Sequence, residues 1–201
     1  MPSGYRVADF LINDPGLARH LDTTPDAREI PEKLLIQQEG EALNLALYLD
    51  PDLLQRLDAN DPTESLHGDN LDDFWLALEG ISHFLYLTWN AGYERSVSLL
   101  EMELQGEVDK YILAAFLFGR QLRGLVPKAL YRQLFEHACF DANLSSAERH
   151  RYRSANYFAS RFCSHIEKEF LRPGARSGLV NTLRRFYRLT QQRKIKAIQT
   201  L

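Results

Sequence analysis

The segment 70–118 constrains the fold of this chain more than any other part of its sequence. Its apolar residues recur with the period of two amphipathic helices joined by a turn of about seven residues, so we expect the helices to pack antiparallel. Polar side chains lie among these apolar residues: Glu79 and His83 in the first helix, Glu103 and Glu107 in the second. Each needs a cation, a shared proton or a hydrogen bond if it is buried.

The composition is that of an ordinary soluble globular protein, with 201 residues, 45% of them hydrophobic and 25% charged. The N-terminal residues lack the basic segment and apolar run of a secretory signal. No stretch approaches the roughly 20 apolar residues of a membrane span. Cys139 and Cys163 form no CxxC motif, which favours two buried free thiols in a cytoplasmic protein.

The net charge of −3 hides a strong asymmetry along the chain. Residues 1–109 hold 22 Asp/Glu against 6 Lys/Arg, and residues 110–201 hold 5 Asp/Glu against 18 Lys/Arg. Such an asymmetry indicates an electrostatic surface that is directed within the molecule or toward a partner.

The first part of the chain predicts little regular structure before residue 32. Residues 1–31 contain four prolines and are expected to form an irregular segment, in which Tyr5 to Ile12 could form one short element. Residues 33–49 predict a β-hairpin, because leucines alternate with other residues from Leu43 to Leu49 and Glu39-Gly40-Glu41 supplies a turn. Leucine and alanine are weak strand formers, so a helix is the alternative here.

Helix signals dominate the remainder. Asp50-Pro51 starts a short helix, and capping boxes at Ser98–Glu101 and Ser145–Glu148 start two long ones. The second must end before Pro173-Gly174, and a last helix runs from Ser177 or Gly178 to near the C-terminus. The predicted fold is mainly α: residues 32–201 form a single-domain helical bundle of about five longer helices and one short one, with the hairpin at its start.

Carboxylates and histidines that project inward from facing helices can hold metals or act in acid–base catalysis. The candidates for catalysis or for a metal are Glu79, His83, Glu103 and Glu107, with His137 as a further metal ligand. Their spacing is Glu-x-x-x-His once and Glu-x-x-x-Glu once. Because di-iron bundles use Glu-x-x-His twice, this spacing argues against a di-iron site of that kind. The alternative is that Glu79 or Glu103 pairs with arginines of the basic half and that His83 is a core or boundary histidine with its hydrogen bonds satisfied. No motif identifies a cofactor or establishes an enzyme.

The C-terminal segment 147–201 is strongly basic, with 13 Lys/Arg against 3 Glu, interleaved with aromatic residues. This pattern fits a solvated or internally paired surface, an acidic protein partner, or a nucleic-acid backbone. Within it, small Ala155 and Ala159 would let a neighbouring helix approach closely. If that neighbour carries Glu103 and Glu107, Arg153 and Asn156 are natural partners, and exposed arginines at 151 and 153 are the alternative.

Three functional hypotheses follow. The favoured one is a non-enzymatic interaction or regulatory protein that presents charged helical surfaces to a protein partner or to a second copy of itself. Its candidate interaction residues are Arg151, Arg153, Asn156, Arg184, Arg185 and Arg188. The second is a helical-bundle metal-binding protein or enzyme that uses the glutamates and His83. The third is nucleic-acid binding through the basic C-terminal helices.

Overall fold

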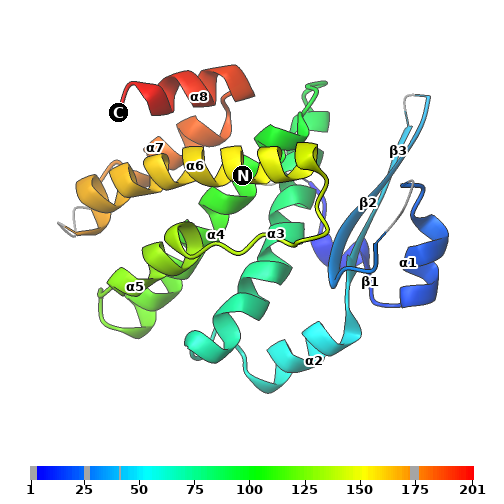
Figure 1. Cartoon of the computed structure of the whole chain (residues 1–201), viewed down its shortest axis with the longest axis horizontal. Coiled ribbons are helices and arrows are strands. Elements are labelled where there is room, and N and C mark those ends of the chain that lie inside the picture. Colours follow the sequence, from blue (N-terminus) through cyan, green and yellow to red (C-terminus); the bar gives the residue numbers. More distant parts are fainter. Residues whose placement is uncertain (1–3, 25–27, 41, 173–176) are drawn as a thin grey trace. The chain divides into compact units, whose positions relative to one another are not determined.

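A computed structural model describes residues 4–24, 28–40, 42–172 and 177–201. Helices dominate these residues and a small three-stranded sheet lies near the N-terminus, which confirms the predicted mainly-α class (Figure 1). The chain divides into two compact units, Met1–Arg95 and Ser96–Leu201, called unit 1 and unit 2 from here on.

Unit 1 begins with three short elements inside the segment that was expected to be irregular. They are the 3-10 turn η1 (Val7–Asp9), strand β1 (Leu11–Ile12) and helix α1 (Pro15–Leu21). Asp14 starts α1 by accepting hydrogen bonds from the backbone N–H groups of Gly16 and Leu17, at 2.7 and 3.0 Å. A capping aspartate followed by proline is a strong local helix start, so the sequence does contain this signal.

The predicted hairpin is present. Strands β2 (Glu32–Glu39) and β3 (Ala42–Leu49) pair antiparallel, with Leu34 opposite Leu47. Gly40 adopts φ 61° in the turn, a left-handed conformation that favours glycine, and Glu41 lies outside the described residues. Strand β1 pairs parallel with β3, so the sheet is mixed with the order β1-β3-β2.

Both faces of β3 are covered near its end. Leu47 and Leu49 pack with Leu53 of α2 (Pro51–Ala59) and with Ala77 of α3 (Gly68–Ala91). Tyr48, on the opposite face, packs with apolar residues of α1 and β2. This double coverage explains why leucine and tyrosine follow one another here without a polar residue between them.

Helix α3 lies very close to the sheet at Gly80. A Cβ atom at this position would lie 2.7 Å from Cδ1 of Leu47 and 2.3 Å from Oε1 of Glu32, so the close approach requires glycine. The helix begins at Gly68, two residues before the segment 70–118 in which it was expected, because His67 and Asn70 form its capping box. It ends at Ala91, and Gly92 follows as its C-cap.

In the described part of unit 2, every regular element is a helix or a helical turn. Its elements are α4 (Leu99–Gln121), α5 (Lys128–Tyr131), the π-helical turn η2 (Arg132–Glu136), α6 (Ser146–Ile166), the π-helical turn η3 (Glu167–Leu171), α7 (Leu179–Tyr187) and α8 (Gln191–Gln199). The Ser145–Glu148 capping box is complete, with hydrogen bonds of 3.2 and 2.8 Å. Ser98 caps α4 through the N–H of Glu101 at 3.1 Å. The predicted stop at Pro173-Gly174 lies outside the described residues.

The prediction of one continuous C-terminal helix is wrong. The helix breaks after Tyr187, and Thr190 adopts an extended conformation with ψ 162° before α8 begins. The break allows α8 to turn back toward the body of unit 2, where it contacts α6 (Figure 1). Ser98 donates a hydrogen bond to the Gln191 side chain at the start of α8.

Candidate functional site

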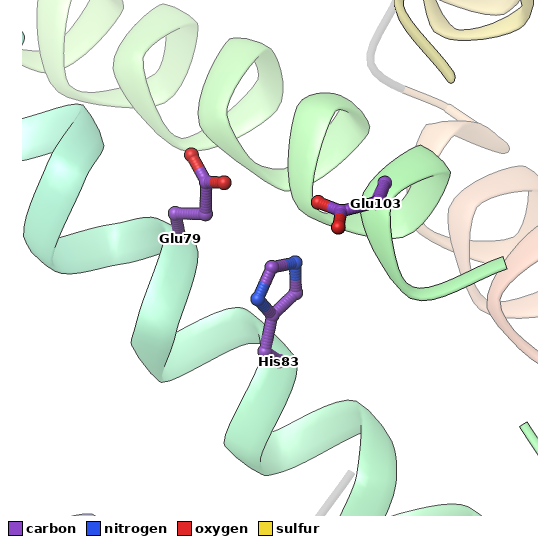
Figure 2. Close-up of side chains that lie close together, drawn as sticks. All are labelled: Glu79, His83 and Glu103. Carbon is purple, nitrogen blue, oxygen red and sulfur yellow. The ribbon is translucent and has the colours of Figure 1, made fainter. Parts of the chain in front are cut away.

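In unit 1, Glu79 and His83 occupy one face of α3. They lie four residues apart and project from successive turns of the helix to the same side (Figure 2). His83 is buried and Glu79 is half-buried. Glu103, the third side chain labelled in Figure 2, belongs to α4 of unit 2. Glu79 and His83 each offer one potential metal-ligating atom, a carboxylate oxygen and an imidazole nitrogen.

In unit 2, α4 packs along α6, and the two glutamates of α4 each have a cationic neighbour. Oε1 of Glu103 lies 3.4 Å from Nε of Arg151 on α6, and Glu103 is only 6% exposed. Glu107 forms an ion pair with Lys110, one turn further along α4. The contact of Glu103 with Arg151 fits the alternative in which an arginine of the basic half pairs with this glutamate.

The arginine that reaches Glu103 differs from the one expected. Ala155 and Ala159 are fully buried on α6, as expected for residues that admit a neighbouring helix. Arg151 lies four residues before Ala155 and therefore on the same stripe, whereas Arg153 lies about 200° around the helix from Arg151 and is exposed. Asn156 donates instead to the backbone carbonyl of Leu134 at 3.3 Å.

The hypothesis of a metal site stays a prediction. Among the described residues, neither Glu107 nor His137 belongs to a cluster of three potential metal-ligating side chains. His137 is exposed where η2 ends. Any cation bound by Glu103 would have to compete with the guanidinium of Arg151.

A buried lysine is the feature of unit 2 that sequence reasoning missed. Lys194 of α8 is fully buried, and its ammonium donates to Oε1 of Gln105 on α4. Gln105 in turn donates to Oδ1 of Asp109 at 2.8 Å. The ammonium also lies 4.7 Å from the ring centroid of Phe186. A signal was present: Lys194 precedes the buried Ile198 by four residues and so lies on the apolar stripe of α8.

The two thiols differ in their surroundings. Cys163 is fully buried, and burial raises its pKa well above the usual value, with the charges of Glu107, Asp109 and Glu167 acting in the same direction. A thiol held in its neutral form is a poor nucleophile and a poor metal ligand. Cys139 is exposed, so the expectation that both thiols are buried is wrong. It lies beyond η2, in the segment that leads to α6.

A pocket of about 580 Å³ lies among α6, α7 and α8. Its surface is mainly apolar, and cationic side chains join it from α7 and α8. The apolar lining residues are Phe162, Phe186, Leu189, Ala197 and Leu201, and the polar ones are His165, Thr182, Arg185, Arg193, Lys196 and Thr200. None of these lining residues is acidic.

Other predicted interaction residues lie on α7 or follow it. Arg184 and Arg185 are exposed, and Arg188 is exposed immediately after the helix ends. Leu179 and Phe186 are the buried residues of the same helix. The separation of charged from buried apolar positions is that of a surface helix.

No protein-family model matches this chain, and no curated protein or solved structure matches it. Among the described residues, no helix combines the length and the apolarity that a membrane crossing requires.

Proposed function

We propose that this chain is a non-enzymatic interaction protein and that unit 2 binds an acidic protein partner. The observation that carries the proposal is a set of exposed cations on α6–α8 that form no ion pair with any described residue. We call this set the exposed cations; they are Arg153, Arg161, Arg184, Arg185, Arg193 and Lys196.

Two groups of cations in unit 2 differ in their surroundings. Lys110, Arg151 and Lys194 are directed inward and engage acids or amides of α4. The exposed cations are left to solvent. Residues 96–201 hold 18 Lys/Arg against 9 Asp/Glu, so unit 2 has a net positive charge that its own acids do not neutralise. A surface of this kind attracts an acidic partner and accelerates its association.

A second copy of the chain is one source of such a partner. Residues 1–95 hold 18 Asp/Glu against 6 Lys/Arg, so unit 1 carries the opposite net charge. Association of unit 2 with unit 1 of another copy would be favoured by these charges and weakened by salt. Analytical ultracentrifugation at about 50 and 500 mM NaCl separates this case from binding to a different protein.

The binding test uses a fluorescent glutamate-rich peptide as the acidic probe. Arg153 and Arg161 lie on the side of α6 that faces away from the buried alanine stripe. We expect the double variant Arg153→Glu/Arg161→Glu to weaken peptide binding by about tenfold or more at low salt. The matched control is Lys128→Glu/Arg132→Glu, which reverses two exposed charges in α5 and at the start of η2.

Two results would contradict the proposal: a wild-type protein that fails to bind the peptide at low salt, or a control that loses as much affinity as the α6 variant. A labelled DNA duplex serves as a competitor. Tighter binding to the duplex, with a steep dependence on salt, would favour the nucleic-acid hypothesis instead.

A further inference from the structure

The pocket among α6, α7 and α8 has the size and lining of a small-molecule site. Such sites occupy roughly 300–1,000 Å³ and are lined mostly by apolar side chains with a few polar groups. At about 580 Å³ the pocket falls inside this range. All of its lining residues belong to unit 2, so the site is complete within one unit.

The apolar part of the pocket is preformed by packed aromatic rings. Phe162 of α6 and Phe186 of α7 stack with their ring centroids 3.8 Å apart and an interplanar angle of 16°. Both residues are at least 96% buried, so they form the packed floor of the pocket, and its accessible apolar side chains are those of Leu189, Ala197 and Leu201. Ala197, with its small side chain, adds space on the α8 side.

The cationic part comes from two helices. Arg193 and Lys196 lie three residues apart, so their side chains leave the same side of α8, and Arg185 approaches from α7. All three are exposed and form no ion pair with a described residue. With no acidic residue in the described lining, the local charge is positive.

We propose that this pocket binds a small amphipathic anion, with an unbranched apolar tail against Leu189, Ala197 and Leu201 and an anionic head between Arg185, Arg193 and Lys196. The head group is a carboxylate or a phosphate, because guanidinium groups match the geometry of both. A helical peptide is a poorer fit, because helix-in-groove recognition needs anchors spread over two or more turns. This proposal goes beyond the acidic-partner function and does not depend on it.

Calorimetric titration of the full chain tests the proposal with four probes: decanoate and decyl phosphate below their critical micelle concentrations, decanol below its solubility limit, and butyrate. We expect 1:1 binding of decanoate or decyl phosphate, with the tighter of the two identifying the head group. Decanol lacks the charge and should bind about tenfold or more weakly. Butyrate lacks most of the tail and should not bind detectably.

Matched variants separate the two parts of the site. Arg193→Gln/Lys196→Gln should weaken anion binding by about tenfold and leave decanol unchanged, while Arg184→Gln, outside the pocket on α7, should have no effect. Ala197→Phe should fill the pocket and block every probe, whereas Gln192→Phe, on α8 outside the lining, should not.

Equal affinity for decanol and decanoate in the wild type would overturn the proposal, and so would equal losses in Ala197→Phe and Gln192→Phe. The circular dichroism spectrum and melting temperature of each variant show whether it is folded, and the glutamine pair stays informative if Ala197→Phe does not fold. The acidic-partner function is tested on Arg153 and Arg161, which do not line the pocket, so the two proposals can fail separately.

Discussion

Replacement of the buried Lys194 tests how α8 is held against α4. The Lys194 side chain is fully buried, its ammonium donates to Gln105, and its charge lies 4.7 Å from the ring centroid of Phe186. Lys194→Ala removes three buried methylene groups, worth about 2–3 kcal/mol at ~0.8 kcal/mol each. It also removes the donor to the Gln105 carbonyl, a loss of about 1–3 kcal/mol.

Part of this cost is offset, because the variant no longer buries an ammonium group. We therefore expect Lys194→Ala to lower the free energy of unfolding by about 3–4 kcal/mol. Lys194→Met keeps most of the buried volume and should cost only about 1–2 kcal/mol, mainly for the lost hydrogen bond and cation–π contact. Urea unfolding at pH 7, followed by circular dichroism, measures both values.

The control is Lys196→Ala, two residues further along α8, where the side chain is exposed. This substitution should change stability by no more than about 0.5 kcal/mol. Hydrogen exchange should show faster opening of α8 in Lys194→Ala, because α8 would lose this contact with α4. Lys194 would not stabilise the packing of α8 against α4 if Lys194→Ala were no more destabilising than the control, or if Lys194→Met were more stable than the wild type.

Three further outcomes follow from unit 2. Glu103→Gln and Arg151→Met should each lower the free energy of unfolding in urea by about 1–3 kcal/mol, and the double variant should lower it by less than the sum; additive losses would contradict the ion pair. Metal analysis of the wild type and of Glu103→Gln tests the metal hypothesis, which requires a bound metal in the wild type that the variant loses. A thiol reagent at pH 8 should label Cys139 quickly and Cys163 only after urea is added, because burial raises the Cys163 pKa; equal labelling rates in the native protein would contradict this. Burial, and after it the charge of Glu167, raises the pKa of Tyr111, so the folded state holds the phenol proton more tightly than the unfolded state does. The stability that this proton contributes should be complete below about pH 10 and should decline above it. Tyr111→Phe should therefore reduce the fall in the free energy of unfolding between about pH 9 and 11, measured in urea.

Local sequence signals determined the beginnings of most elements. The Ser145–Glu148 capping box joins residues three apart, so its hydrogen bonds form wherever the helix lies. Asp50 and Pro51 start α2 for the same reason, and the alternation that ends at Leu49 sets the register of the hairpin. Asp14 and Pro15 form an equally local helix-start signal, so the sequence of residues 1–31 predicts helix α1 in spite of its four prolines.

The candidate sites depended on contacts between residues far apart in the chain. The sequence indicated that Glu103 needs a cation, but only the packing of α4 along α6 selected Arg151 over Arg153. The break after Tyr187 brought Lys194 to Gln105, 89 residues earlier in the chain, and created the pocket beside α7.

Residue type and spacing thus determined the helices, the hairpin and the need for charge compensation within unit 2. Which cation reaches Glu103 or Gln105 depends on the rotation of each helix about its axis and on the break in the chain after Tyr187. No spacing rule specifies these, because they are set by how apolar stripes such as that of Ala155 and Ala159 pack together. Tertiary structure alone therefore decided which cations of the basic half pair with acids or amides of α4 and which remain exposed.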